Sequence, residues 1–307
     1  MPSTTRASAA LAAAALCLTA AACGASGGSS GGSSAPAAAD AGLRRLVPAS
    51  FTAKGAVTVA VIQSPPFSVV EGGGKVSGIT VDLLRTASAR LGLTPRFVPV
   101  ASSAVVAGLA SGKFDLAGQR GDYVERQGAA ATIDLVHSHA GGLVPASAVK
   151  AATSISYVCG RRVGLQQGSI ANETIGLLNA VCAKAGKAAG RPSFFPDFNA
   201  MALALRSGRV DIVLNDRAGN QVAARASGGT IAAVDFPDAD LPGFHDTLLG
   251  PGTSAANRPL AEAFLAAFRA MAADGTYAAR FDAYGVAEAK LPADRIRING
   301  STQKLAG

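Results

Sequence analysis

Short β-rich runs alternate with segments of helical periodicity along most of this chain. The run over 57–62 is apolar or β-branched throughout and ends at a proline pair, which predicts a buried strand. Apolar residues recur at helical spacing over 81–91, and a glycine follows directly as a helix stop. The pattern then predicts a strand over 96–100, a helix over 104–109 and a strand over 114–117. This order of strands and helices predicts a parallel sheet.

The same order of elements recurs in the second half of the chain, after a break near Pro145. The pattern predicts strands over 162–166, 193–195 and 210–214, and helices over 172–185 and 200–205. The chain leaves this second α/β unit around 237–242. A strongly periodic helix over 260–273 follows, then a shorter one that ends at Tyr284, and residues after Leu291 carry no clear pattern.

Two similar phrases mark equivalent strands in the two units. One reads Ser-Gly-Lys-Phe-Asp at 111–115, and the other reads Gly-Arg-Val-Asp at 208–211. Their carboxylates, Asp115 and Asp211, lie inside strand phrases, so we expect them to hold the structure of each unit and not to bind a ligand. Asp82 falls in the first turn of a predicted helix, where an acid complements the helix dipole.

Residues 1–22 have the pattern of a signal peptide, with Arg6 as a weak positive start and an apolar stretch over 11–22 that is too short to span a membrane. Small residues directly precede Cys23, as at a bacterial lipoprotein processing site. We therefore expect cleavage to leave Cys23 as a lipidated N-terminus. That motif usually has Leu or another larger aliphatic residue where Ala20 stands, and the alternative is ordinary cleavage that releases a secreted protein.

Residues 23–47 are predicted to form a linker, because the stretch over 24–42 is rich in Gly, Ser and Ala and has no periodicity. It would hold the folded body away from the membrane. The body contains Cys159 and Cys182, and outside the cytoplasm an even pair predicts a disulfide. Such a bridge would stabilise the fold by roughly 3 kcal/mol. We expect no metal site here, because no His or further Cys lies near either cysteine.

The composition favours a packed protein, with 49% hydrophobic and 16% charged residues. The formal net charge is +8, but the positive charges are scattered and no basic run is interleaved with aromatics. We therefore expect no nucleic-acid partner. A basic protein tethered to a membrane would also be attracted to anionic lipid.

Six phrases carry a family resemblance in their sequence and their order. They are Pro-Pro-Phe at 65–67, Gly-Ile-Thr-Val-Asp-Leu at 78–83, Leu-Ala-Ser-Gly-Lys-Phe-Asp at 109–115, Glu-Arg at 125–126, the stretch 159–169 that begins Cys-Gly-Arg-Arg-Val-Gly, and Asp-Gly-Thr-Tyr at 274–277. Together they resemble the bacterial extracellular solute-binding proteins of the amino-acid type (family 3), the extracytoplasmic receptors of ABC importers. The resemblance covers roughly residues 57–285.

The resemblance implies an α/β fold of the type II periplasmic-binding-protein-like class, with two lobes joined by two crossovers and a ligand cleft between them. Such lobes close around ligand like a hinge. Lobe one is expected over 48–144 plus 244–290 and lobe two over 147–240, with a C-terminal tail over 291–307.

The resemblance also implies a ligand-binding site. Arg126 matches the arginine that binds the ligand α-carboxylate, for which a planar guanidinium is well suited. Asp216 matches the acid that binds the α-ammonium. Gly168, Ser169 and Ile170 match the segment whose backbone N–H groups donate to the same carboxylate at a helix N-terminus. Ile170 stands where the family usually has Thr. Taken without the resemblance, Arg126 is a solvated surface residue and Asp216 caps the helix after its strand.

Departures from the family pattern affect the part of the site that would hold the ligand side chain. Tyr123 replaces a small Thr, and Gly121 stands where a polar residue often lines the cleft. The stretch around Ser102 lacks the aromatic residue on which the ligand side chain commonly stacks. We therefore expect a wider or wetter pocket lined by Gln119 and Arg120. Such a pocket leaves open a ligand that is larger than the usual amino acid or is acidic.

The leading hypothesis is a monomeric binding receptor, without cofactor or enzymatic activity, that delivers an amino acid or similar polar solute to an ABC permease and ATPase. A sensor that signals through a membrane partner would use the same cleft. An extracytoplasmic dehydratase would need a general acid, for which Asp216 and Glu71 are the candidates. His137 and His139 share one face of a strand, but no third ligand lies near them and we expect no metal site.

Overall fold

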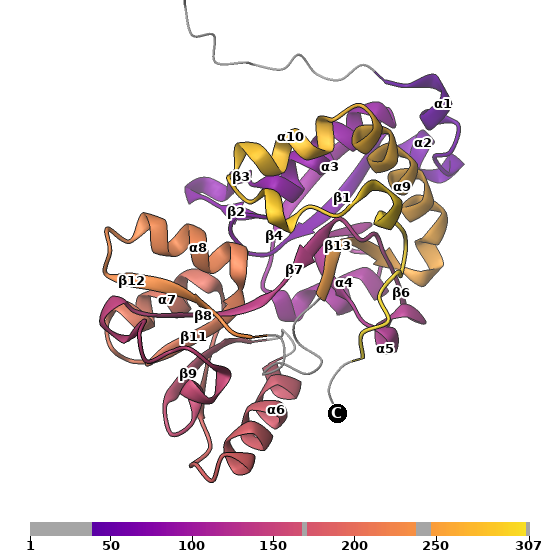
Figure 1. Cartoon of the computed structure of the whole chain (residues 1–307). Coiled ribbons are helices and arrows are strands. Elements are labelled where there is room, and N and C mark those ends of the chain that lie inside the picture. Colours follow the sequence, from indigo (N-terminus) through magenta and orange to yellow (C-terminus); the bar gives the residue numbers. More distant parts are fainter. Residues whose placement is uncertain (1–38, 168–170, 238–246, 305–307) are drawn as a thin grey trace, which may run out of the picture. The chain divides into compact units, whose positions relative to one another are not determined.

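The computed structural model describes residues 39–167, 171–237 and 247–304. Their strands form two larger sheets and a short hairpin of β2 (Val69–Val70) and β3 (Val76–Ser77) (Figure 1). The predictions for the signal peptide, for Cys23, for the linker as far as residue 38, and for Gly168, Ser169 and Ile170 lie outside the described residues.

The first sheet combines parallel and antiparallel strands. β1 pairs in parallel with β4 and β5, whereas β13 runs antiparallel to β5, β6 and β7. The strands are β4 (Thr94–Pro99), β1 (Ala56–Val61), β5 (Leu116–Asp122), β13 (Thr247–Ser254) and β6 (Ala130–Thr132) in spatial order, with β7 (Val136–Ser138) also paired to β13.

The second sheet has the same mixed character. β9 pairs in parallel with β10 and β11, and β8 is antiparallel to β11 and β12. In spatial order the strands are β10 (Arg191–Phe195), β9 (Arg162–Gln166), β11 (Ile212–Asp216), β8 (Ala140–Pro145) and β12 (Ile231–Asp235). The three parallel strands that the sequence predicts in each unit are present, and antiparallel strands that it did not predict extend both sheets.

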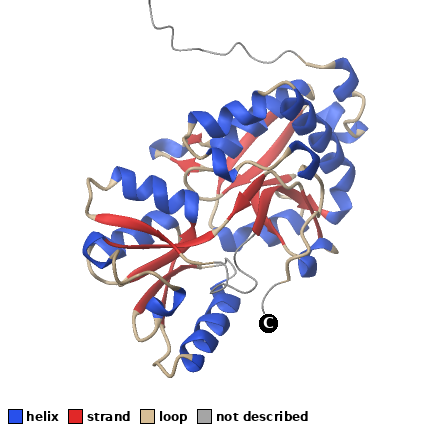
Figure 2. Ribbon diagram, in the orientation of Figure 1, coloured by secondary structure: helices blue, strands red, loops and turns tan. Residues whose placement is uncertain are grey.

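Helices lie beside both sheets (Figure 2). On the first sheet, α3 (Ile79–Arg90), α9 (Arg258–Ala273) and α10 (Thr276–Ala283) share the main core with Val59 and Leu116, and α4 (Val105–Ala110) packs on the opposite face against Ala60 and Ala117. On the second sheet, α6 (Ala171–Lys184) covers the face of Ile212, and α7 (Phe198–Arg206) covers the face of Val213. Successive residues of one strand thus belong to cores on opposite faces of the sheet.

Four short helices complete the described part: α1 (Ala41–Arg44), α2 (Ala49–Lys54), α5 (Val124–Gln127) and α8 (Arg217–Ala226). α1 begins at Asp40, whose Oδ1 accepts hydrogen bonds from the backbone N–H groups of Gly42 and Leu43. Val47 joins the main core. Ordered structure thus extends into the stretch that composition assigned to the linker, because a cap and one buried side chain leave little trace in a composition.

Asp115 and Asp211 occupy equivalent positions in the two sheets. Asp115 Oδ2 accepts a hydrogen bond from the Thr58 N–H at 2.7 Å, and Asp211 Oδ2 accepts one from the Arg162 N–H at 2.8 Å. Each acid therefore ties the start of the central strand to the loop before the neighbouring strand. Ion pairs with Lys54 and Arg162 add to this, and the Arg162 hydrogen bond lowers the pKa of Asp211. The structural role expected for both acids is confirmed.

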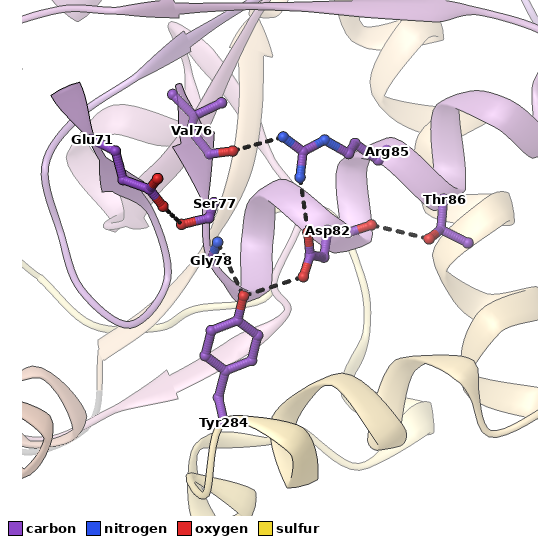
Figure 3. A network of polar contacts seen from close by, with 8 residues as sticks. All are labelled: Glu71, Val76, Ser77, Gly78, Asp82, Arg85, Thr86 and Tyr284. Atoms are coloured by element: carbon purple, nitrogen blue, oxygen red, sulfur yellow. Dashed lines mark hydrogen bonds and ion pairs between the residues drawn. The ribbon is translucent and has the colours of Figure 1, made fainter. Parts of the chain in front are cut away.

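A hydrogen-bond network ties the N-terminus of α3 to the end of the C-terminal helices (Figure 3). The Tyr284 hydroxyl donates to Asp82 Oδ2 at 3.2 Å and accepts from the Gly78 N–H at 3.1 Å. Arg85 donates to the other oxygen of Asp82 at 2.9 Å. Gly78 has a φ of 117°, and a Cβ there would lie 2.6 Å from the Phe67 carbonyl oxygen, so this turn requires glycine. Asp82 is in the first turn of its helix, as expected.

The C-terminal tail packs against the first sheet although its sequence has no periodicity. Ile298 bridges to Ile133, and the backbone N–H groups of Gly300 and Ser301 donate to Asp134 and Asp122 at 2.9 and 2.8 Å. Asp134 is fully buried. Its burial, and secondly the nearby charge of Asp122, raise its pKa to about 8. Asp134 therefore keeps its proton at neutral pH in the folded chain.

We expect the free energy of unfolding to decrease as pH rises from 5 to 7, because the folded state holds a proton on Asp134 that the unfolded chain, with a pKa near 3.8, has released. One such proton contributes at most about 1.4 kcal/mol per pH unit. Asp134→Asn keeps an acceptor for Gly300 and cannot ionise. Urea unfolding at several pH values should show the variant gaining up to about 2.7 kcal/mol on the parent over these two pH units. Parallel pH profiles would contradict the assignment.

Candidate functional site

A cavity of about 210 Å³ lies where β1 and β5 end. Ligands of α/β proteins bind beyond the carboxyl ends of parallel strands, where the loops leave a crevice. The volume is below the range of about 300–1,000 Å³ that holds drug-sized ligands, so the cavity suits a small solute. Its described lining is Ile62, Ser64, Ser102, Val105, Val106, Gln119, Arg120, Gly121, Tyr123, Arg126 and Leu249.

The cavity brings together six residues that the sequence pointed to. Ser102 comes from the turn before α4, Gln119, Arg120 and Gly121 from β5, Tyr123 from the position before α5, and Arg126 from α5. Their roles toward a ligand remain predictions. Sequence reasoning missed Leu249, because it lies on the unpredicted strand β13. Ile62 and Ser64 follow the first strand directly, and that position beside the crevice could have identified them.

Arg126 lies in the last turn of α5, with its guanidinium 5.0 Å from the centre of the Tyr123 ring. A guanidinium over an aromatic face is favoured by the ring quadrupole, which holds the planar fork in one orientation. Arg126 makes no hydrogen bond or ion pair to another side chain within the described ranges. Its N–H groups are therefore available to an anion.

Two departures from the family pattern compensate each other. A Cβ at Gly121 would lie 2.5 Å from Cε2 of Tyr123, so the tyrosine ring occupies the space that a side chain at 121 would need. The ring is buried, and its hydroxyl is 3.5 Å from Thr247 Oγ1. The glycine at position 121, near the end of β5, thus leaves room for the ring of Tyr123, which follows the strand directly.

Arg120 places a second guanidinium in the same cavity. Its side chain is partly buried, and burial lowers its pKa, as does the charge of Arg126. Over the described residues, the side chain of Arg120 makes neither a hydrogen bond nor an ion pair. Two like charges therefore share a small space, and the described lining includes no carboxylate that could compensate them.

Gln119 contributes an unused acceptor. Its Oε1 atom is buried and has no hydrogen-bond partner in the described part of the chain. An unsatisfied buried acceptor costs about 1–3 kcal/mol. A ligand that donated a hydrogen bond here would remove that penalty. The cavity thus offers two cationic donors and one acceptor.

Asp216 has protein partners for both of its oxygens. Oδ1 accepts from the N–H groups of Ala218 and Gly219 at 2.8 and 3.2 Å and so caps α8, and Oδ2 accepts from the Ser138 hydroxyl. Burial raises the pKa of this carboxyl group, against the effect of these hydrogen bonds. Asp216 therefore caps α8, as its sequence context alone suggests. It is not in the described lining of the cavity. Binding of a ligand ammonium by Asp216 stays a prediction.

Two histidines lie against each other at the end of β7, just before β8 begins. The ring centroids of His137 and His139 are 4.4 Å apart. Within the described residues, no group of three or more His, Cys, Asp or Glu side chains could hold a metal ion. In the same part of the chain, no helix is long and apolar enough to cross a membrane.

Comparison with known proteins places these observations in a family. The profile of the bacterial extracellular solute-binding proteins, family 3, matches residues 57–287. No curated protein sequence matches the chain significantly.

Solved structures share the fold of this chain. An amino acid ABC transporter substrate-binding protein from Streptococcus pneumoniae, bound to L-arginine, is 20% identical, with 79% of this chain and 99% of that chain covered and a TM-score of 0.65. Another ABC uptake transporter substrate-binding protein from that organism, with bound histidine, is 18% identical over 76% and 94% of the chains, with a TM-score of 0.67. A histidine kinase sensor domain is 17% identical over 75% and 95%, with a TM-score of 0.63. At these identities the similarity shows the two-lobed fold and leaves the ligand open.

Proposed function

Because this chain belongs to the bacterial extracellular solute-binding proteins of family 3, we propose that it captures an amino acid or a similar small polar solute in the cavity beside Arg126. The observation that carries this proposal is an arginine whose side chain has no acceptor among the described residues, on the wall of a small cavity beside the carboxyl ends of the parallel strands β1 and β5. A guanidinium in such a place binds a carboxylate by two parallel hydrogen bonds.

The wider setting of this function is an ABC importer. The receptor would be a monomer anchored by lipidated Cys23 to the outer face of the cell membrane, and it would pass its ligand to a permease and ATPase. Two solved structures of similar fold are described as ABC transporter substrate-binding proteins, which supports this setting. Closure of the two lobes around ligand would present the loaded form to the permease.

A sensory role is the second candidate, because a histidine kinase sensor domain has the same fold. Uptake of labelled ligand by cells with and without the gene separates the two roles, since only a transport receptor is needed for uptake. An enzymatic role has less support. The described lining of the cavity includes no Asp, Glu or His to act as general acid, and Glu71 is paired with Ser77 and Lys75.

The test of the proposed function is a thermal-shift panel of the twenty amino acids and simple polyamines. A ligand present at 100 times its dissociation constant stabilises the folded state by about 2.7 kcal/mol, so at least one amino acid should raise the melting temperature clearly. Polyamines, which lack a carboxylate, should have no effect. If no amino acid shifted the transition at millimolar concentration, capture of an amino acid in this cavity would be wrong.

A further inference from the structure

The cavity carries more positive charge than one amino-acid carboxylate can compensate. Arg120 and Arg126 both line it, and neither has an ion-pair partner over the described residues. Proteins rarely leave a partly buried guanidinium unpaired, because removing such a charge from water is unfavourable unless an anion compensates it. The missing compensation points to the ligand.

The position of Arg120 on β5 suggests that it is held for a ligand. The strand continues on both sides of it, and Gly250 lies opposite it on β13. A Cβ at Gly252 would lie 3.2 Å from Cδ of Arg120, so the side chain runs closely along β13 and has little freedom to swing into solvent. A cation held in this way is preorganised for a second anionic group.

The third unused group has the opposite polarity. Gln119 Oε1 is a buried acceptor without a donor among the described residues. It comes from the same strand as Arg120 and lines the same cavity. A ligand that satisfies all three groups has two anionic ends and one hydrogen-bond donor between them.

We propose that this cavity selects an amino acid with a second carboxylate on its side chain, bound with one carboxylate on Arg126 and the other on Arg120. We expect the ammonium group to donate a hydrogen bond to Gln119 Oε1. The small volume of the cavity favours a ligand of the size of glutamate or aspartate. A ligand with a cationic side chain is excluded, because it would bring a second cation besides its ammonium group into a cavity whose described lining has two guanidinium groups and no carboxylate. This inference rests on the proposed function and narrows its ligand class.

The direct test is calorimetric titration of the purified protein with five probes: L-glutamate, L-aspartate, L-glutamine, L-asparagine and L-arginine. We expect glutamate or aspartate to bind at least about 10-fold more tightly than its own amide, because the amide leaves Arg120 uncompensated. L-Arginine should show no binding. Equal or tighter binding of an amide or of arginine would overturn the inference.

Arg120→Met tests the residue itself, with Arg206→Met on the exposed side of α7 as the matched control for net charge. Arg120→Met should weaken binding of the acidic ligand about 10- to 100-fold and change binding of its amide by less than about threefold. Arg206→Met should change neither. Without ligand, Arg120→Met should melt at or above the temperature of the parent, since it removes an unpaired cation. A lower melting temperature, or equal weakening of acid and amide, would show a structural role and overturn the inference.

The outcomes separate this inference from the function on which it rests. If a neutral or basic amino acid bound best and Arg126→Met abolished that binding, the receptor function would stand and the selectivity would be wrong. If none of the twenty amino acids bound, both would be wrong.

Discussion

Arg126→Met should lower the affinity for the bound amino acid at least about 100-fold, which is about 2.8 kcal/mol of binding free energy. The methionine keeps apolar contact with Tyr123 but removes both N–H donors that would face the carboxylate. Charge-assisted, bidentate hydrogen bonds are the strongest that a site of this kind can offer. The loss of affinity should appear as faster dissociation of the ligand, because the Arg126 guanidinium holds the carboxylate after the ligand has entered the cavity.

Two further variants make this result specific. Arg126→Lys keeps the charge but loses the planar fork, so it should recover only part of the affinity. Arg206→Met lies outside the cavity and should bind as the parent does. Parental affinity in Arg126→Met, with correct folding shown by its circular dichroism, would mean that Arg126 is a solvated surface residue. That was the alternative interpretation of its sequence context.

The second large effect concerns the disulfide between Cys159 and Cys182, which is formed with the two Cα atoms 5.4 Å apart. It joins the loop before β9 to α6 across a core that includes Val163 and Leu178. The Cys159→Ala, Cys182→Ala double variant should lose about 3 kcal/mol of unfolding free energy, because the open chain gains conformational freedom when unfolded. Urea unfolding measures this loss.

Reduction of the unmodified chain provides the control for the double variant. Both sulfur atoms lie in a buried cluster, so truncation to alanine also leaves space that reduction does not. Reduction alone should therefore account for most of the loss, with a smaller additional loss in the double variant. A variant whose stability differed from the parent by less than about 0.5 kcal/mol would show that the bridge constrains little.

The local pattern predicted the parallel part of both sheets and missed the antiparallel part for a physical reason. β1 is buried on both faces and has a continuous apolar and β-branched sequence, and the centre of β9 is buried as well. β8 and β13 contain several glycines and a proline, which weaken any strand signal. In β13, Gly250 is needed because a Cβ there would overlap the Ile133 carbonyl oxygen. Close packing between distant segments selects such residues, and local propensity cannot reveal it.

The candidate site, like the fold, could be predicted only in part from the sequence. The motif order pointed to Arg126, Gln119, Gly121 and Ser102, and all four line the cavity. The compensation between Gly121 and Tyr123 could not be read from spacing, because it depends on the rotamer of the tyrosine. That no acid among the described residues compensates Arg120 is likewise a property of the fold, since acids far away in sequence could have approached it.

Capture of an amino acid by Arg126 is tested most directly by a crystal structure of the purified protein grown with the amino acid that gives the largest thermal shift. We expect the ligand to occupy the cavity at the ends of β1 and β5, with two carboxylate oxygens within hydrogen-bonding distance of the Arg126 guanidinium. For an acidic amino acid, the second carboxylate should contact Arg120. A ligand bound elsewhere, with Arg126 facing only solvent, would show that Arg126 does not bind the ligand.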